Sequence, residues 1–222
     1  QPEGRFVLLS KVEDSILAGD KEFFLSNHQY AGAFFPGEHL YLAEYRQAPY
    51  PHFIYRIGDV NLHKSILMVQ GADTVLIRYF VQCADFPFQL RIKPLLAFRG
   101  FHELAHENHF LRPELNTDAV RNGFAITPYQ GLPTLHIQGS RAMEIEPRPL
   151  WYRRFEYEQE AARGFPAQED LFHPAQLQVR LEAGESFILA AGLAPLKSPA
   201  NKIWEREEAA RTGPPPSPRA RP

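Results

Sequence analysis

The 222 residues include only one cysteine and no long apolar run. The first shortage excludes a domain held by internal disulfides, and the second excludes a protein with a membrane-spanning helix. Cys83 cannot form an internal disulfide, so the core must be held together by packing alone. It lies in a strand-like run, where we expect a small buried thiol. No run approaches the roughly 18 apolar residues of a membrane-spanning helix, and the N-terminus has no basic-then-apolar signal pattern. The sequence therefore predicts a cytoplasmic protein with no membrane partner.

An excess of charge of either sign is also missing. Lysine and arginine together number 24 and the acidic residues number 26. No field therefore concentrates phosphate groups at the surface, and nucleic acid is excluded as a partner. G-x-S-x-G, P-loop and G-x-G-x-x-G motifs are absent, which removes the commonest signals of serine hydrolases, nucleotide hydrolysis and dinucleotide binding. We predict no cofactor.

Aromatic residues, by contrast, make up 13% of the sequence, in short apolar runs that suit strands. Apolar and polar residues alternate in 88–93, 135–137 and 177–182, as in strands with one buried face. Denser runs indicate strands covered on both faces, at 5–12, 40–46, 52–57, 60–69, 74–81 and 186–191. Many short strands separated by turn residues predict one all-β domain, an antiparallel β-supersandwich.

Two stretches depart from this pattern and favour helix. Residues 155–163 are rich in Glu, Gln and Ala and end at Gly164, which predicts a short internal helix with a glycine C-cap. Ser198 and Pro199 supply the N-cap and the first helical position of a C-terminal helix, which we expect to end at Gly213.

The C-terminal helix has a thin apolar face, because only Ile203, Trp204 and alanines could dock. We therefore expect it to lead to another domain rather than to fill this core. The proline-rich residues 213–222 predict an extended linker or a disordered tail. The predicted organisation is a β domain over 1–195 and a helix with a linker or tail over 196–222.

The residues from His102 to His106, H-E-L-A-H, match a zinc-protease motif. In that motif, helical i, i+4 spacing places both imidazoles on one metal, and the Glu polarises the bound water. Residues 92–98 alternate and include Pro94, so we interpret them as a strand that ends at Arg99. The favoured interpretation is two histidines in a loop after a strand. A zinc hydrolase remains a remote alternative, and we predict no metal site.

Aromatic and charged residues gather between 151 and 172. A sugar ring has an apolar C–H face and a rim of hydroxyls, so sugar sites combine aromatic platforms with polar groups. The residues that fit are Trp151, Tyr152, Arg153, Glu156, Glu169 and Asp170. The competing interpretation is that Trp151, Phe155 and Phe172 are core aromatics, and composition alone favours it.

Several segments resemble the N-terminal domain of bacterial and archaeal glycogen debranching enzymes of the amylo-α-1,6-glucosidase type. They are VLLSKV (7–12), FIYRIGD (53–59), KPLLAFRGFHELAHENH (93–109), PYQGLP (128–133) and WYRRFEYEQEAARGFPAQEDLFHP (151–174). The likeness covers about residues 4–195. The family pattern R-x-x-H-x-L-x-H-E-N matches Arg99, His102 and His106 and leaves Glu103 at a variable position. This adds Arg99, His102 and His106 to the candidate substrate-binding residues.

The resemblance implies a β-supersandwich like that of galactose mutarotase, placed before an (α/α)6 barrel that holds the catalytic carboxylates. Such enzymes hydrolyse the α-1,6-linked glucose at a trimmed branch point of glycogen. The implied partners are therefore the barrel of the same polypeptide and α-glucan, and no catalytic residue is expected in this chain. The alternative is a free-standing sugar-active enzyme of the mutarotase type. The upstream segment expected in the family is not found, so we expect a fragment with one unpaired sheet edge.

Overall fold

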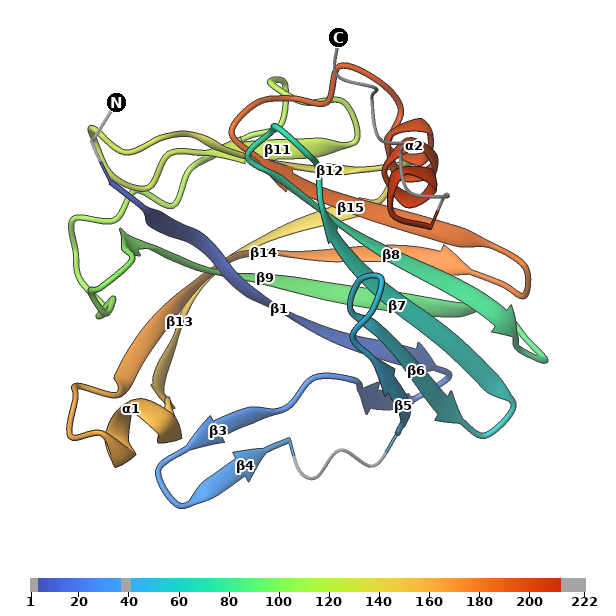
Figure 1. Cartoon of the computed structure of the whole chain (residues 1–222), viewed down its shortest axis with the longest axis horizontal. Coiled ribbons are helices and arrows are strands. Elements are labelled where there is room, and N and C mark those ends of the chain that lie inside the picture. The colour runs from blue at the N-terminus through green and yellow to red at the C-terminus, as the bar shows by residue number, and fades with distance from the viewer. Residues whose placement is uncertain (1–3, 37–40, 213–222) are drawn as a thin grey trace, which may run out of the picture.

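The computed structural model describes residues 4–36 and 41–212, which form two antiparallel sheets packed face to face (Figure 1). The first sheet contains, in spatial order, β13 (Glu144–Glu156), β14 (Gln168–Leu181), β9 (Phe88–Gly100), β1 (Phe6–Ala18) and β2 (Lys21–Phe24). The second contains β10 (Leu115–Asn116), β11 (Gly123–Ile126), β12 (Leu135–Gly139), β15 (Ser186–Gly192), β8 (Thr74–Cys83), β7 (Val60–Met68), β6 (His52–Ile57) and β5 (Leu42–Arg46). A separate hairpin is formed by β3 (His28–Tyr30) and β4 (Ala33–Phe35). The predicted all-β sandwich is confirmed.

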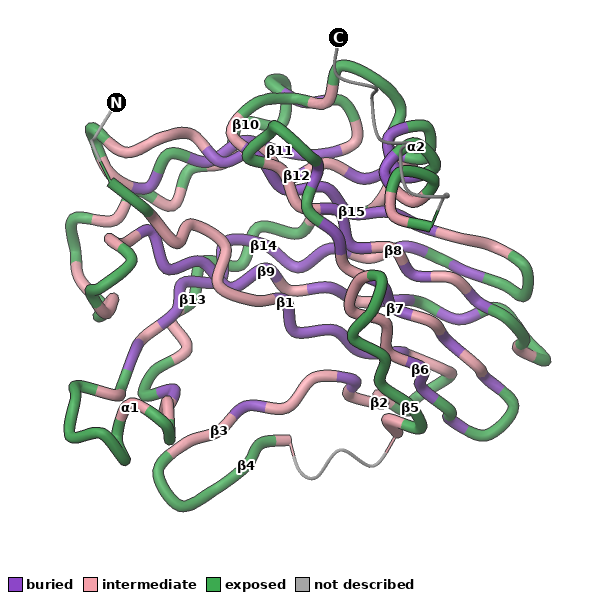
Figure 2. The backbone as a smooth tube through the Cα atoms, viewed as in Figure 1, coloured by how far each residue is buried: buried purple, intermediate pink, exposed green. Residues whose placement is uncertain are grey.

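The core lies between the two sheets, and the apolar residues of the alternating runs are buried in it as predicted. Figure 2 shows buried positions, in purple, along the strands of both sheets. Leu90 and Ile92 of β9 and Leu177 of β14 are at most 1% exposed. A charged pair also lies within this core, since Lys64 Nζ is 2.5 Å from Asp14 Oδ2. Tyr79 donates its hydroxyl to the same carboxylate at 3.0 Å. Pairing of this kind is what allows ionised groups to be buried.

Strand β1 continues past position 12, the end of the predicted apolar run, because its next charged residues also have partners. Glu13 lies on the face turned away from the core, where Lys93 Nζ of β9 donates to it at 2.5 Å. Lys11 Nζ donates to His28 Nδ1 at 2.8 Å, so His28 Nε2 carries the proton that is donated to Glu13. Burial alone would raise the pKa of Glu13, but hydrogen bonds from His28 and Lys93 lower it to about 2.

The two edges of the five-stranded sheet differ. One edge is β13, which contains Pro147 and Pro149 and shifts register twice against β14. Prolines and bulges obstruct the addition of a further strand. At the other edge, β2 pairs only with residues 15–18 of β1, and the following residues bond to β1 as far as Val12. The expected unpaired edge therefore lies over residues 6–11 of β1, with no strand partner in the described part of the chain.

The short internal helix is α1 (Glu158–Ala162), which is shorter than the predicted 155–163. Phe155 and Glu156 pair with β14 as the last residues of β13, because the side chain of Phe155 is buried against the sheet. After α1, Gly164 has the positive φ value of 76° expected of a residue that closes a helix.

The C-terminal helix, α2 (Ala200–Thr212), packs through the thin apolar face that the sequence predicted and lies outside the core between the sheets. That it leads to another domain stays a prediction. Trp204 is 2% exposed and packs with Ile203 against Leu76 and Ile188 on the outer face of the eight-stranded sheet. The thin face suffices because that sheet presents an apolar patch of its own. The division at 195/196 stays a prediction. Three predicted features lie outside the described residues: Gly213, the linker over 213–222 and the first residue of the strand 40–46.

Cys83 was expected to be buried, and that expectation is wrong. It is the last residue of β8 and is exposed, because the strand extends beyond the buried Val81. Among the described residues, no helix is long and apolar enough to cross a membrane.

Candidate functional site

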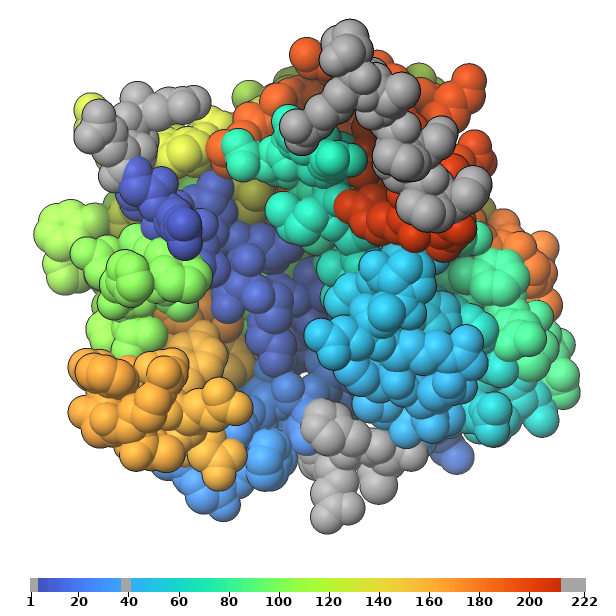
Figure 3. Space-filling view, viewed as in Figure 1, coloured from blue at the N-terminus to red at the C-terminus, as the bar shows by residue number. Residues whose placement is uncertain are grey.

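Two irregularities bend the strands that lead into the candidate site. Phe98 on β9 and Arg154 on β13 have φ values of 47° and 62°, which residues other than glycine rarely adopt. The pairing of β13 with β14 shifts register between Tyr152 and Phe155, and an extra residue at such a bulge turns the strand. Beyond these points β9 leads into the 101–110 loop and β13 into α1. The two segments lie side by side in Figure 3, in green and orange.

Glu169 of β14 holds the two sides of the site together. Its side chain is fully buried and accepts hydrogen bonds from Arg99 and from the hydroxyl of Tyr157. The backbone N–H of Ala105 donates to the same carboxylate at 3.0 Å. Burial and the hydrogen bond to Glu169 raise the pKa of Tyr157 to about 12, so this phenol stays a donor. One carboxylate thus joins β9, the 101–110 loop and the start of α1.

The next residue, Asp170, fixes the loop a second time. Its backbone N–H donates to the carbonyl of Ala105 at 2.8 Å. Its carboxylate accepts from the backbone N–H of Glu107 at 2.9 Å and of Arg154 at 2.8 Å. Glu107 in turn pairs with Arg153 at the surface. Residues 105–107 are therefore tied to β14, although 64 positions separate Ala105 from Glu169.

A groove of about 1050 Å³ lies between the 101–110 loop and α1, and we call it the loop–helix groove. Phe101 and Phe165 line it and are 54% and 59% exposed. Glu103 and the glutamates at 156, 158 and 160 line the same groove. The other lining residues include Val7, Gln29, Arg99 and His102. The guanidinium of Arg163 lies over the Phe165 ring, 5.8 Å from its centre. Partly exposed rings beside carboxylate acceptors complement a pyranose, which has an apolar face and a rim of hydroxyls.

A family model described as "Glycogen debranching enzyme N terminal" matches residues 1–188 of the chain. The chain belongs to this family. The resemblance seen in the sequence is thereby confirmed, and the loop–helix groove is a feature of a debranching-enzyme N-terminal domain.

Twenty chains of known structure match this debranching-enzyme domain. One is a bacterial glucoamylase complexed with acarbose, with a TM-score of 0.41 and 6% sequence identity. The match covers 90% of this chain and 29% of that chain, so this chain spans less than a third of its length. No curated protein matches the sequence significantly.

The nine candidate residues fall into three groups in the debranching-enzyme domain. Three of them, Arg99, His102 and Glu156, line the loop–helix groove. Four lie beneath or beside it, namely Glu169, Asp170, Arg153 and His106, whose Nδ1 is 3.9 Å from an Asp170 oxygen. The remaining two, Trp151 and Tyr152, are not among the lining residues.

Trp151 and Tyr152 alternate along β13 and face opposite sides of the sheet. Trp151 is half-buried against Phe172 and the core. Tyr152 packs with Phe155 and His28 on the outer side. The core interpretation therefore holds for Phe155 and Phe172, which are 4% and 3% exposed.

Sequence reasoning did not select Phe101, Phe165 or Tyr157 as site residues. A signal was present for the two phenylalanines, since Phe101 follows Gly100 and Phe165 stands between Gly164 and Pro166. A large apolar residue inside turn-forming residues is seldom a core residue.

The H-E-L-A-H segment lies in the loop after β9 and contains no helix, so the loop interpretation is confirmed. The i, i+4 argument for a shared zinc ligand requires a helix and does not apply here. Across residues 4–36 and 41–212, no group of three or more His, Cys, Asp or Glu side chains is arranged to hold a metal ion.

Proposed function

We propose that this chain is the non-catalytic N-terminal domain of a glycogen debranching enzyme, that it supports an (α/α)6 catalytic barrel of the same polypeptide, and that the loop–helix groove contacts α-glucan. Family membership supports the first part. The observation that carries the last part is the pair of exposed rings, Phe101 and Phe165, among the groove carboxylates. The proposal includes the cytoplasmic location expected from the sequence.

The side chains of the groove are of the types that bind a glucose unit. A phenyl ring stacks on the C–H face of a glucose unit, and carboxylates of Glu103 and Glu156 accept hydrogen bonds from its hydroxyls. Arg99 donates to Glu169, which leaves its guanidinium fixed at the groove wall. Glu169 and Asp170 accept five hydrogen bonds or ion pairs, two from the backbone of the loop and three from Arg99, Arg154 and Tyr157. Because these contacts hold both walls of the groove, the groove is formed before a ligand arrives.

The test is binding of maltoheptaose to the 222-residue chain, measured by isothermal titration calorimetry. Stacking of one ring on a planar ligand contributes about 1 to 3 kcal/mol by analogy with base stacking, so Phe101→Ala with Phe165→Ala should weaken binding at least tenfold. Phe86→Ala is the matched control, since Phe86 is 51% exposed and outside the groove. Equal affinity of the wild type, the double variant and the control would contradict glucan contact.

If the rings serve only to dock the barrel, the double variant should bind maltoheptaose as well as Phe86→Ala does. In the complete enzyme it should then lose the contact between domains. Calorimetry and limited proteolysis of the complete enzyme therefore separate the two roles of the groove.

A further inference from the structure

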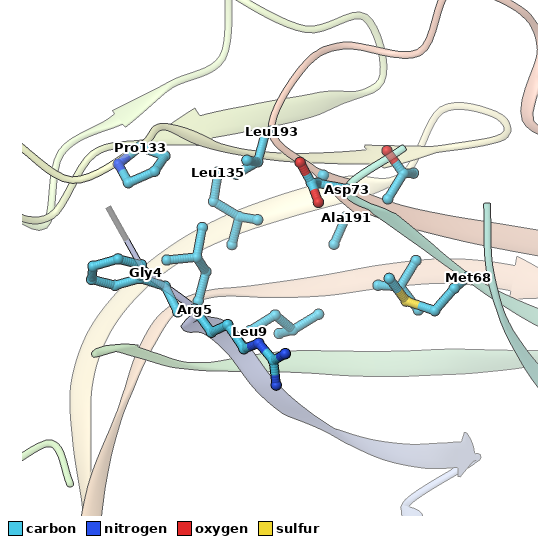
Figure 4. A pocket seen from close by; sticks show the side chains of 14 residues that line it. Gly4, Arg5, Leu9, Met68, Asp73, Pro133, Leu135, Ala191 and Leu193 are labelled. Carbon is cyan, nitrogen blue, oxygen red and sulfur yellow. The ribbon is translucent and has the colours of Figure 1, made fainter. Parts of the chain in front are cut away.

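The two faces of β1 carry different chemistry. Toward the eight-stranded sheet, Leu9 lines an apolar pocket of about 520 Å³ (Figure 4). The opposite face carries Lys11 and Glu13, which lie beneath His28 of β3 and Phe155 of β13. Lys11 is partly exposed, whereas Glu13 and His28 are buried. The outer face therefore offers one amine to solvent beside a buried imidazole and a buried carboxylate.

These three side chains form a chain of hydrogen bonds that ends at the amine. Lys11 Nζ is 2.8 Å from His28 Nδ1, and the other ring nitrogen, His28 Nε2, bonds to an oxygen of Glu13. The second oxygen of Glu13 accepts from Lys93 at 2.5 Å, which holds the carboxylate in place. Nucleophiles are activated by this order of groups, in which a base contacts the nucleophile and a carboxylate orients the base.

The surroundings of Lys11 favour its uncharged form. Burial lowers the pKa of this amine most, and the positive charge of Lys64 lowers it further. Asp14 and Glu13 act in the opposite direction, but the pKa still falls from 10.5 to about 8. At pH 7 about a tenth of Lys11 is therefore neutral, against roughly one part in 2,500 of an ordinary lysine.

Hydrogen bonding leaves the lone pair of the neutral amine free. A neutral amine has two hydrogens and one lone pair. Lys11 donates one hydrogen to the carbonyl of Asn27 at 3.0 Å and the other to His28. Within residues 4–36 and 41–212, Nζ has no third hydrogen-bond partner. The free lone pair is the group that attacks an electrophile.

We propose that Lys11 is a covalent binding site for a small aldehyde, which its amine attacks while His28 accepts the proton. A bond forms between Nζ and the carbonyl carbon, the π electron pair moves to the oxygen, and one proton of Nζ passes to His28 Nδ1. The carboxylate of Glu13 stabilises the resulting imidazolium. His28 then returns the proton to the oxygen. Loss of this hydroxyl with the second proton of Nζ, as water, leaves an imine.

The chemistry of the site selects an aldehyde. Imine formation requires only proton transfers, which His28 provides in both directions, and it consumes no oxidant or reductant. The aldehyde must be small, because Lys11 is only partly exposed and its Nζ lies 5.8 Å from the centre of the Phe155 ring.

The test is labelling of the 222-residue chain with glyceraldehyde and sodium cyanoborohydride, which reduces an imine to a stable amine. Peptide mass spectrometry measures the rate at each lysine separately. At pH 7 Lys11 should be labelled about tenfold faster than Lys202, which is exposed on α2. The larger neutral fraction is partly offset, because a nucleophile of lower pKa is intrinsically weaker. In the chain unfolded by urea, the two rates should become equal.

The pH dependence and one variant test the roles of the neighbours. The labelling rate at Lys11 should level off above about pH 8, where its amine is neutral. His28→Gln should slow labelling at Lys11 about tenfold, because the base is lost. If His28 only held β3 in place, its loss would expose Lys11 and raise the rate. His63→Gln is the matched control, since His63 bonds to Gln82 on the other sheet and its loss should leave labelling unchanged.

Three results would overturn the proposal. One is an equal rate at Lys11 and Lys202 in the folded chain at pH 7. Another is a rate at Lys11 that keeps rising to pH 10, a result that needs no variant. The third is a His28→Gln variant, folded by circular dichroism, in which Lys11 is labelled as fast as in the wild type or faster.

Discussion

At the scale of single residues, Glu169 is the side chain on which the site depends most. Glu169→Gln removes the charge that balances Arg99, whose side chain is only 14% exposed. Breaking one partner of a buried pair leaves the other uncompensated, so we expect a loss of about 3 kcal/mol in the free energy of unfolding, measured with urea. Hydrogen exchange in residues 101–107 should also become faster, since the loop loses an acceptor.

Glu160→Gln is the control for this loss. Glu160 pairs with Arg163 at the surface, where both side chains are more than a third exposed. An exposed pair of this kind contributes about 1 kcal/mol or less. A Glu169→Gln variant no less stable than Glu160→Gln would show that Glu169 does not hold the loop.

Residue types and the resemblance indicated the charged members of the site, but they could not indicate how these residues are joined. The Arg99 to Glu169 and Glu107 to Asp170 contacts span 70 and 63 positions, and no local pattern records such a distance. The direction in which Trp151 points was also beyond prediction, because Trp151 lies between two register shifts of β13 against β14.

At the scale of elements, helix boundaries were less predictable than strands. Phe155 and Glu156 have helix-compatible neighbours, yet pairing with β14 outweighs local propensity. The position of α2 was indicated by the apolar runs of the sheet more than by the sequence of the helix itself. Runs 60–69, 74–81 and 186–191 were predicted to be covered on both faces, and α2 is what covers the outer face there.

Trp204 should account for much of the attachment of α2. Trp204→Ala removes a side chain that packs against Tyr50 and Arg78 as well as the sheet, and we expect a loss of about 3 to 5 kcal/mol in the free energy of unfolding. Lys202→Ala, on the exposed side of the same helix, should change it by about 0.5 kcal/mol or less. Losses below about 1 kcal/mol for Trp204→Ala would mean that the helix detaches without weakening the sandwich.

At the scale of the whole molecule, alternation of apolar residues was sufficient to predict the sandwich, because each period-two run has one face to bury. The order of strands was not predictable. β9 lies between β1 and β14, so its neighbours come from opposite ends of the sequence. The shortest strands, such as β10 and β4, are too brief to carry a periodic signal.

The stability of the whole chain should fall when the pH is lowered. Burial lowers the pKa of His173 from 6.5 to about 4, so between these values the unfolded chain binds a proton that the folded chain does not. Acidification from pH 6.5 to 4 therefore favours unfolding, by about 3 kcal/mol in total for this residue. Glu13 adds a second loss of stability between pH 4.5 and 2, because its pKa is lowered from 4.5 to about 2 in the folded chain.

Urea unfolding at a series of pH values tests this. In His173→Gln, the free energy of unfolding should change less between pH 6.5 and 4 than in the wild type. His102→Gln, at an exposed loop position, should show the pH dependence of the wild type. An unaltered slope in His173→Gln would assign the acid sensitivity to other groups.

The prolines of β13 also limit how far chains can associate. Growth of a fibril by edge-to-edge pairing needs two open edges on the same sheet, one to accept a neighbour and one to offer the next position. Pro147 and Pro149 obstruct one of them, and β1 provides the other. Edge pairing through this sheet alone therefore stops at two chains, because β13 obstructs the addition of a third.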